Sequence, residues 1–96
     1  MKRVFILSVS WAYNGDSGHD IVGVFADKEN AIKRLKMEAE SEKCLSWFAH
    51  HFDNELNFVD KDDTSIDFEE SDTKFYFHDN WSCNFMEFWI DEHNIE

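Results

Sequence analysis

Alternation of large apolar residues with smaller or polar ones near the start of the chain constrains the fold more than any other feature. Every second position from residue 5 to residue 13 holds such a residue: Phe5, Leu7, Val9, Trp11 and Tyr13. A period of two places successive side chains on opposite faces of an extended chain. Residues 5–13 are therefore predicted to form a long strand with one strongly apolar face.

A second strand is predicted directly after the first. Residues 14–18 read Asn-Gly-Asp-Ser-Gly, and Asn-Gly and Gly favour tight turns because they adopt positive φ at little cost. Residues 21–25 then read Ile-Val-Gly-Val-Phe, which is typical of a returning strand. Gly23 in its middle indicates a bulge or a close backbone approach. The chain is thus expected to begin with a β-hairpin.

A helical segment is predicted after the hairpin. Asp27 is a suitable N-cap, and the apolar residues that follow recur at helical spacing: Ala31, Ile32, Leu35 and Ala39. A second run with the same spacing contains Leu45, Phe48 and Phe52. Because the pattern slips over residues 40–43, we expect one long helix with a bend or two shorter helices. The basic residues are expected on the outer face: Lys33, Arg34, Lys36 and Lys43.

The second half of the chain is predicted to add three strands. Residues 53–65 are expected to form a loop with three apolar residues turned inward: Leu56, Phe58 and Val59. Residues 66–69 alternate as a half-buried strand, residues 69–72 resemble a hairpin turn, and the next strand carries Phe75 and Phe77. A last strand is predicted over residues 84–91, with Phe85 and Trp89 on one face and the remaining large apolar residues on the other: Met86, Phe88 and Ile90.

These elements describe one α+β domain over residues 1–96, in the order β-β-α-β-β-β. We expect an antiparallel sheet of about five strands with a helix or a bent helix pair packed on one face. Ten Phe, four Trp and two Tyr supply the bulk that so short a chain needs for a core. An open sheet leaves two edges, so the protein is expected to be a monomer or a homodimer.

Cysteine content and hydropathy indicate a location for the protein. The two cysteines, Cys44 and Cys83, are too few for a disulfide scaffold, so a reducing compartment is expected. No apolar run is long enough to span a membrane. A cytoplasmic protein that does not contact the membrane is therefore predicted.

Charge is divided unevenly between the two halves of the chain. Residues 1–52 contain seven basic and seven acidic side chains, whereas residues 53–96 contain two basic and fourteen acidic ones. The whole formal charge of −12 therefore belongs to the second half. Direct binding to nucleic acid is disfavoured, because such binding draws its affinity from neutralising phosphates. A basic protein partner fits this charge better.

The acidic residues of the second half are candidates for a recognition surface. Side chains two residues apart on a strand are about 6.7 Å apart, so Asp67 and Glu69 are expected to project as a row of carboxylates. Such a row imitates a phosphate backbone, and exposed aromatic residues can anchor it on a partner. The candidate partner-binding residues are Asp60, Asp62, Asp63, Asp67, Glu69, Glu70, Asp72, Asp79, Tyr76 and Trp81, with Trp89 as a further aromatic candidate. In the alternative interpretation the acids only keep the domain in solution, and Trp81 and Trp89 lie in the core.

Metal binding and catalysis are weakly supported. Asp60, Asp62 and Thr64 have the early spacing of a calcium loop, but Ser65 stands where glycine is needed and Ser71 where the closing acid is needed. The cysteines and histidines lack the paired spacing of a zinc site. A small enzyme that uses Cys44 or Cys83 as a nucleophile remains an alternative, with His78 or His19 as a base. We expect no metal, no cofactor and no enzymatic activity.

The first part of the chain resembles small proteins encoded by phages and mobile elements. The resemblance covers residues 3–40 and rests on the segments Val-Phe-Ile-Leu-Ser-Val (4–9) and Ile-Val-Gly-Val-Phe (21–25), and on Asp27 and Glu29 before Ala31-Ile32. In such proteins a hairpin ending in a Gly-Val-Phe-type strand runs into a helix. Small acidic proteins of this kind often antagonise host defence, and anti-CRISPR proteins are the best-known class. The resemblance implies a stoichiometric inhibitor in the host cytoplasm and assigns no functional residue.

The leading functional hypothesis is a non-enzymatic inhibitor, of anti-CRISPR or other anti-defence type. Its acidic half is expected to dock on the basic surface of a nucleic-acid-binding protein. The first alternative is an immunity protein that neutralises a basic toxin such as a nuclease. The second is a small domain with no charge-driven role, for which partner binding would be insensitive to salt.

Overall fold

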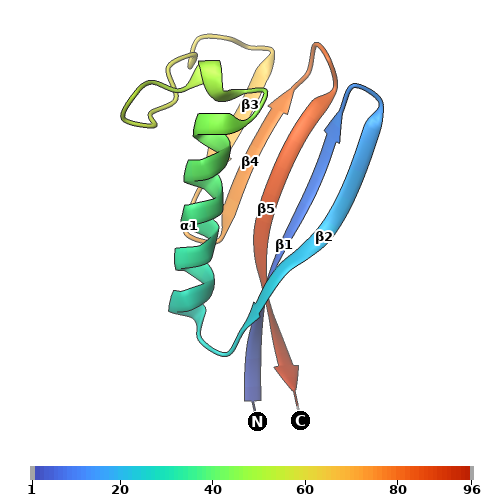
Figure 1. Ribbon diagram of the computed structural model, residues 1–96, viewed down its shortest axis with the longest axis vertical. Helices are drawn as coiled ribbons and strands as arrows, with labels where there is room; N and C mark the ends of the chain where they lie inside the picture. The colour runs from blue at the N-terminus through green and yellow to red at the C-terminus, as the bar shows by residue number, and fades with distance from the viewer. Residues whose placement is uncertain (1, 96) are drawn as a thin grey trace.

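One antiparallel sheet carries a single α-helix on one face in the computed structural model, which describes residues 2–95 (Figure 1). The strands β1 (Lys2–Tyr13), β2 (Asp16–Phe25), β3 (Ile66–Glu70), β4 (Lys74–Asp79) and β5 (Asn84–Ile95) stand in the spatial order β2-β1-β5-β4-β3. Between β2 and β3 lie helix α1 (Lys28–Leu45) and the 3-10 turn η1 (Ala49–His51). The predicted α+β class and five-stranded antiparallel sheet are confirmed.

The N-terminal hairpin closes through a shorter turn than the sequence suggests. Asn14 and Gly15 alone connect β1 to β2, and both have positive φ, 50° and 88°. Two residues of positive φ match the right-handed twist of the flanking strands. Strand β2 therefore begins at Asp16 and pairs with β1 up to Phe25.

Gly23 fulfils both predicted roles. The pairing of β1 with β2 shifts register between Leu7 and Ser8, which face Gly23 and Ile21, so Val22 is the extra residue of a bulge. A Cβ on Gly23 would lie 2.9 Å from the ring of Phe25, so the ring covers the glycine.

Of the two predicted alternatives, one helix or a bent helix pair, the described part of the chain has the single helix α1, and the run with Phe48 and Phe52 forms the 3-10 turn η1 and the residues beside it. The Asp27 side chain accepts a hydrogen bond from the backbone N–H of Glu29 at 3.1 Å, as the N-cap prediction requires. The chain leaves the helical path at Ser46, whose backbone is extended. Leu45 is therefore exposed, while Phe48 turns back into the core just before η1.

Phenylalanine rings fill the space between the helix and the sheet. The rings of Phe48 and Phe77 stack with their centroids 4.5 Å apart, and both residues are fully buried. Leu7, Leu35, Ala39, Phe52, Phe75 and Phe88 belong to the same buried cluster. The core thus lies under the second half of α1 and η1, over β1, β5 and β4.

Three sequence predictions about side-chain placement are wrong. Val59 is 52 % exposed, because the segment between η1 and β3 turns only Phe58 firmly onto the core. Glu70 is the last residue of β3 and does not belong to the hairpin turn. Lys43 is buried at 8 % exposure, on the inner side of α1.

Truncation of the central ring should test this core. Phe48→Ala is expected to lower the free energy of unfolding by about 3–5 kcal/mol, because it removes a buried ring and leaves a cavity. Met37→Ala, at an exposed position of α1, should change it by less than about 0.5 kcal/mol. Urea denaturation followed by circular dichroism measures both, and equal effects of the two variants would contradict this description of the core.

Candidate functional site

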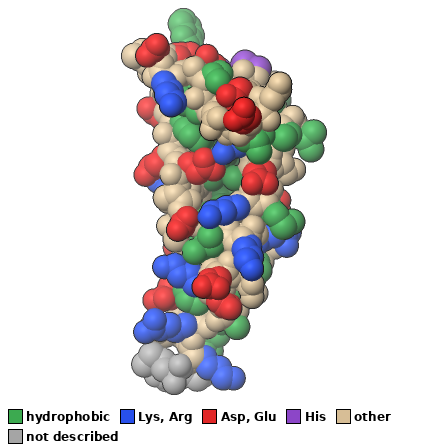
Figure 2. Space-filling view, turned by 90° about the vertical axis from the view of Figure 1, so that its left-hand side faces the viewer, with side chains coloured by type: hydrophobic (Ala, Val, Ile, Leu, Met, Phe, Trp, Pro, Cys, Tyr) green, Lys and Arg blue, Asp and Glu red, His purple; other side chains and the backbone are tan. Residues whose placement is uncertain are grey.

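The two faces of the sheet differ in what covers them. Helix α1 packs on one face, and within residues 2–95 no element packs on the other, which we call the open face. The surface on the helix side mixes Lys and Arg with Asp and Glu over most of its length (Figure 2). No single-sign patch is therefore available on that side of the molecule, and the candidate site lies elsewhere.

Five aspartates gather at one end of the sheet. Asp60, Asp62 and Asp63 precede β3, Asp67 lies within it, and Asp79 ends β4 opposite Ile66. We call these five residues the acidic end. The loop before β3 is tied to the turn after β4 by Asn80, whose backbone N–H donates to the Ser65 carbonyl oxygen at 2.8 Å. The acidic end is thus formed by two segments that are connected directly.

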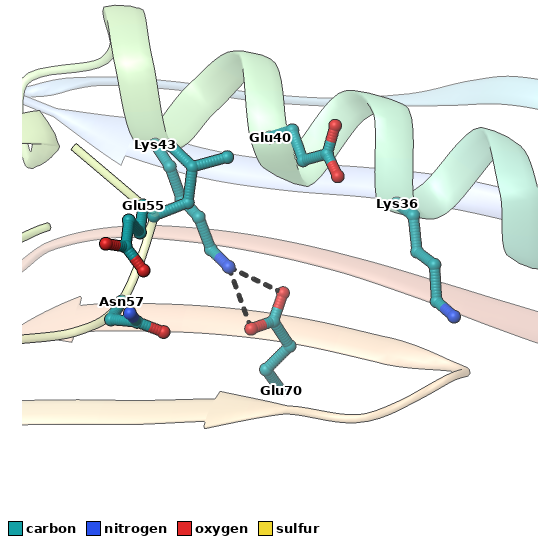
Figure 3. Close-up of a pocket in the computed structure, with 7 residues that line it drawn as sticks. Lys36, Glu40, Lys43, Glu55, Asn57 and Glu70 are labelled. Atoms are coloured by element: carbon teal, nitrogen blue, oxygen red, sulfur yellow. Dashed lines mark hydrogen bonds and ion pairs between the residues drawn. The ribbon is translucent and has the colours of Figure 1, made fainter. Parts of the chain in front are cut away.

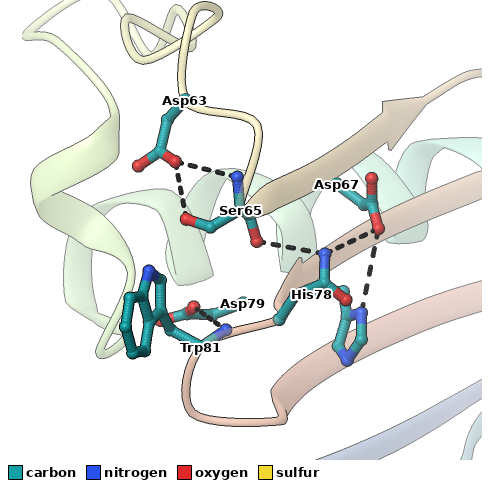
Figure 4. Close-up of polar contacts among 7 residues, drawn as sticks. Asp63, Ser65, Asp67, His78, Asp79 and Trp81 are labelled. Atoms are coloured by element: carbon teal, nitrogen blue, oxygen red, sulfur yellow. Dashed lines mark hydrogen bonds and ion pairs between the residues drawn. The ribbon is translucent and has the colours of Figure 1, made fainter.

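Local hydrogen bonds restrain four of the five carboxylates of the acidic end, those of Asp60, Asp63, Asp67 and Asp79, and Figure 4 shows three of them. Asp63 Oδ1 accepts from the Ser65 backbone N–H at 2.9 Å and from its hydroxyl at 2.5 Å. Asp67 Oδ2 accepts from the Asn80 side-chain amide at 3.0 Å. Asp60 Oδ2 lies 2.5 Å from His51 Nδ1. Asp63 and Asp67 remain exposed despite these bonds, and Asp62 is exposed as well.

Trp81 lies at the acidic end, beside Asp79 (Figure 4). It lies in the turn between β4 and β5 and is 86 % exposed, the most exposed of the large apolar residues. Its backbone N–H donates to Asp79 Oδ1 at 2.9 Å, and its side chain lines a shallow hollow with Ser65 and Asn80. The indole is a large apolar surface in water with a polar N–H at its edge, and it lies next to a carboxylate that its own backbone holds in place.

The expected row on β3 is present on the open face. Asp67 and Glu69 face away from the helix, and the aromatic ring of Tyr76 lies beside them, because Tyr76 pairs with Glu69 across the strands. Lys74 Nζ lies 3.4 Å from Glu69 and 3.6 Å from Glu87. Two carboxylates therefore lie against Lys74, and this part of the open face keeps a negative charge.

The titration of two side chains on the open face reflects this charge. Burial raises the pKa of Tyr76, and the carboxylates of Asp67 and Glu87 raise it further. The hydrogen bond to Glu69 raises the pKa of Lys74. Carboxylates of β3 and β5 thus contribute to the raised pKa of both side chains.

Two predicted site residues lie on the other side of the sheet. Glu70 accepts two hydrogen bonds from Lys43 Nζ, at 2.9 and 3.0 Å (Figure 3). Asp72 Oδ1 lies 3.6 Å from Lys36 Nζ. Both acids therefore neutralise lysines of α1. The structure separates them from the acidic end, and they do not extend the row.

The buried Lys43 is a structural residue that the sequence did not reveal. Its ammonium group lies 5.4 Å from the ring centroid of Phe52 and 5.9 Å from that of Phe75. A lysine on a helix is normally an exposed residue, and only the acidic partner on β3 explains its burial. The neighbouring hollow of about 330 Å³ holds two lysines and three glutamates among its lining residues, so its charges nearly cancel.

Other sequence candidates do not form a site. Within residues 2–95 no three His, Cys, Asp or Glu side chains are placed to hold a metal ion. Cys44 and Cys83 are both exposed free thiols in different parts of the fold. None of the helical segments that the structure describes is long and apolar enough to cross a membrane.

Sequence reasoning missed the residues that organise the acidic end. Ser65 and Asn80 connect its two segments, and the sequence marked neither residue as part of the site. Asp-x-Ser at 63–65 and Asp-x-Trp at 79–81 are spacings at which an aspartate caps a backbone N–H two residues on. These two spacings could have identified both turns from the sequence, although they do not show that the turns lie side by side.

Comparison with known proteins adds no relative. No protein-family model matches the chain, and neither the curated proteins nor the solved structures give a match.

Removal of Glu70 should destabilise the fold, whereas removal of its neighbour should not. Glu70→Ala leaves the ammonium group of Lys43 buried without its partner, at an expected cost of about 1–3 kcal/mol. Glu69→Ala is the matched control, since Glu69 makes an exposed pair on the opposite face, and it should cost less than about 1 kcal/mol. Urea denaturation measures both, and a larger loss for Glu69→Ala would show that the Lys43 pair is unimportant.

Asp63 should titrate below the ordinary range of an aspartate. The Ser65 hydroxyl, followed by the Ser65 backbone N–H, lowers the pKa of Asp63. Because the folded pKa lies below the unfolded one, Asp63 stabilises the fold above the unfolded pKa, and this contribution is lost as pH falls through the folded pKa. An NMR titration of the carboxyl carbon measures the midpoint, and Ser65→Ala should raise it. An unchanged midpoint in that variant would contradict the assignment.

Proposed function

We propose that the chain is a non-enzymatic binding protein whose acidic end docks on the basic, nucleic-acid-binding surface of a partner protein. The observation that carries the proposal is the exposed indole of Trp81 beside carboxylates held by local hydrogen bonds. Charge alone steers a partner and adds modest affinity, whereas a tryptophan in the middle of a charged surface supplies an anchor.

The fixed geometry supports recognition over simple solubility. Acids that only keep a protein in solution need no partners, yet Asp63, Asp67 and Asp79 each accept a hydrogen bond that restricts their side chains. Restricting them before binding reduces the entropy lost when a partner docks. The same carboxylates repel nucleic acid, so the partner is a protein whose surface is basic.

An inhibitor of host defence, such as an anti-CRISPR protein, would act in this way in the cytoplasm of the host. It would occupy the channel or groove that normally holds nucleic acid. An immunity protein against a basic nuclease toxin is the second candidate, because it needs the same acidic surface. The identity of the captured partner distinguishes the two.

The test is capture of partners from host lysate on the immobilised protein. At about 0.1 M salt the bait should retain nucleic-acid-binding proteins, and about 1 M salt should release them, since the Debye length falls from about 10 Å to about 3 Å. Duplex DNA or RNA added at low salt should also displace them. Retention that neither salt nor nucleic acid affects would contradict the proposal and favour a domain with no charge-driven role.

Variants of the acidic end should lose the captured partner. Trp81→Ala is expected to weaken binding by about 2 kcal/mol, roughly 30-fold in Kd, as for a central aromatic anchor. Asp62→Asn with Asp67→Asn should slow association roughly tenfold at low salt. The control Glu29→Gln with Glu40→Gln removes the same charge from α1 and should leave binding unchanged. Equal losses in the two double variants would show that only net charge matters.

A further inference from the structure

The two edges of the sheet differ in length and in charge. Edge strand β3 has five residues, and three of them are acidic. Short, charged edges resist pairing with a strand of another chain. Edge strand β2 has ten residues, and the five from Ile21 to Phe25 carry no charge. Of the two edges, β2 is therefore the one on which a further strand can add.

The bulge in β2 gives this edge an apolar surface. Ile21 faces Ser8 and Val24 faces Ile6 of β1, on the open face in both cases. Because Val22 is the extra residue of the bulge, side chains three positions apart lie on the same face. Ile21 and Val24 are 57 % and 59 % exposed. With Ile6 they form what we call the aliphatic corner of the open face.

We propose that β2 pairs with β2 of a second copy of this chain, antiparallel and about a two-fold axis, so that Ile21 of one copy faces Val24 of the other. The contact is self-complementary, because each copy contributes the same patch. In this register Asp20 faces Phe25 and not the Asp20 of the other copy. The two open faces then join into one continuous face with a shared apolar stripe at the junction.

The bulge selects this register. Ile21 and Val24 both lie on the open face, while Asp20 and Phe25, which face Val9 and Phe5, both lie on the helix face. When Ile21 of one copy faces Val24 of the other, both side chains lie on the open face. In the same register Asp20 faces Phe25, and both of these side chains lie on the helix face. A shift by one residue would place Asp20 against Val24, whose side chains point to opposite faces, and lose this match.

The distribution of charge supports a second copy as the occupant. Residues 1–52, which form β1, β2 and α1, have no net formal charge, and the charge of −12 lies on residues 53–96. Because β2 and β3 are opposite edges, pairing through β2 places the two acidic halves at the outer ends of the joined sheet. Contact through β3 or through the open faces would bring the acids together.

The dependence on salt concentration distinguishes this association from the binding of a basic partner. Two copies repel through their net charge, whereas backbone hydrogen bonds and apolar contacts hold the edges together. Screening therefore strengthens the pairing of copies as salt rises, and it weakens the docking of a basic protein. The two interactions use different surfaces and respond to salt in opposite directions, so one can fail without the other.

Sedimentation of the whole chain tests the association. The unaltered protein should reach twice the 11.5 kDa mass of one chain, with a dimer fraction that rises with protein concentration and between about 0.1 M and about 1 M salt. Val24→Lys should abolish the dimer. Val59→Lys is the matched control, since Val59 has similar exposure but lies in the loop before β3, and it should leave the dimer intact. A single-chain mass for the unaltered protein under all conditions, or a dimer that survives Val24→Lys, would overturn the proposal.

Cross-linking tests the register. In a background with Cys44→Ser and Cys83→Ser, an equimolar mixture of the Ile21→Cys and Val24→Cys variants should form a disulfide-linked dimer under mild oxidation. Either variant alone should form far less, because each new cysteine faces an aliphatic residue of the other copy. Circular dichroism confirms that both variants fold. Cross-linking of Ile21→Cys alone as efficiently as the mixture would overturn the register.

Discussion

The antiparallel ladder between β1 and β5 is the interaction on which the rest of the structure depends. It pairs eleven residues of each strand, from Lys2 with Ile95 to Ala12 with Phe85. This ladder places the last strand in the centre of the sheet, between β1 and β4. As a result, strands of the neutral N-terminal half lie toward one edge of the sheet, which is β2. Strands of the acidic C-terminal half lie toward the other edge, which is β3.

The separation of charge along the chain thereby becomes a separation in space. On the helix side, Lys43 and Lys36 neutralise Glu70 and Asp72, which fastens α1 to the β3–β4 hairpin. The carboxylates near Trp81 have no lysine within the distance of an ion pair in the described part of the chain. The acids of the second half therefore include a set that pairs with lysines of α1 and a set near Trp81 whose only basic neighbours within that distance, in the described residues, are His51 and His78.

Local sequence patterns predicted the helix and the strands. Contacts between residues far apart in the sequence determined where the strands end and which side chains are buried. Alternation identified β1, β3, β4 and β5, the turn residues before Ile21 identified β2, and Asp27 identified the start of α1. The outer ends of β1 and β5 were missed because their charged residues do not alternate, and only the ladder between them keeps them extended. Glu70 was predicted to lie in the hairpin turn, and ending β3 one residue early removes the information on which face its side chain occupies. Lys43 looked exposed because its acidic partner is 27 positions away in the sequence. Trp81 was proposed as a site residue on chemistry alone. Its exposure depends on a turn whose conformation the sequence does not determine.

The central claim is that the acidic end is the surface that meets the partner. The most direct measurement is NMR chemical-shift mapping of the isotope-labelled protein as the captured partner is added. We expect the largest changes at the Trp81 indole N–H and at backbone amides of residues 60–67 and 79–83, with little change along α1. Changes concentrated on α1, or on the hollow around Lys43, with an unperturbed Trp81, would contradict the claim.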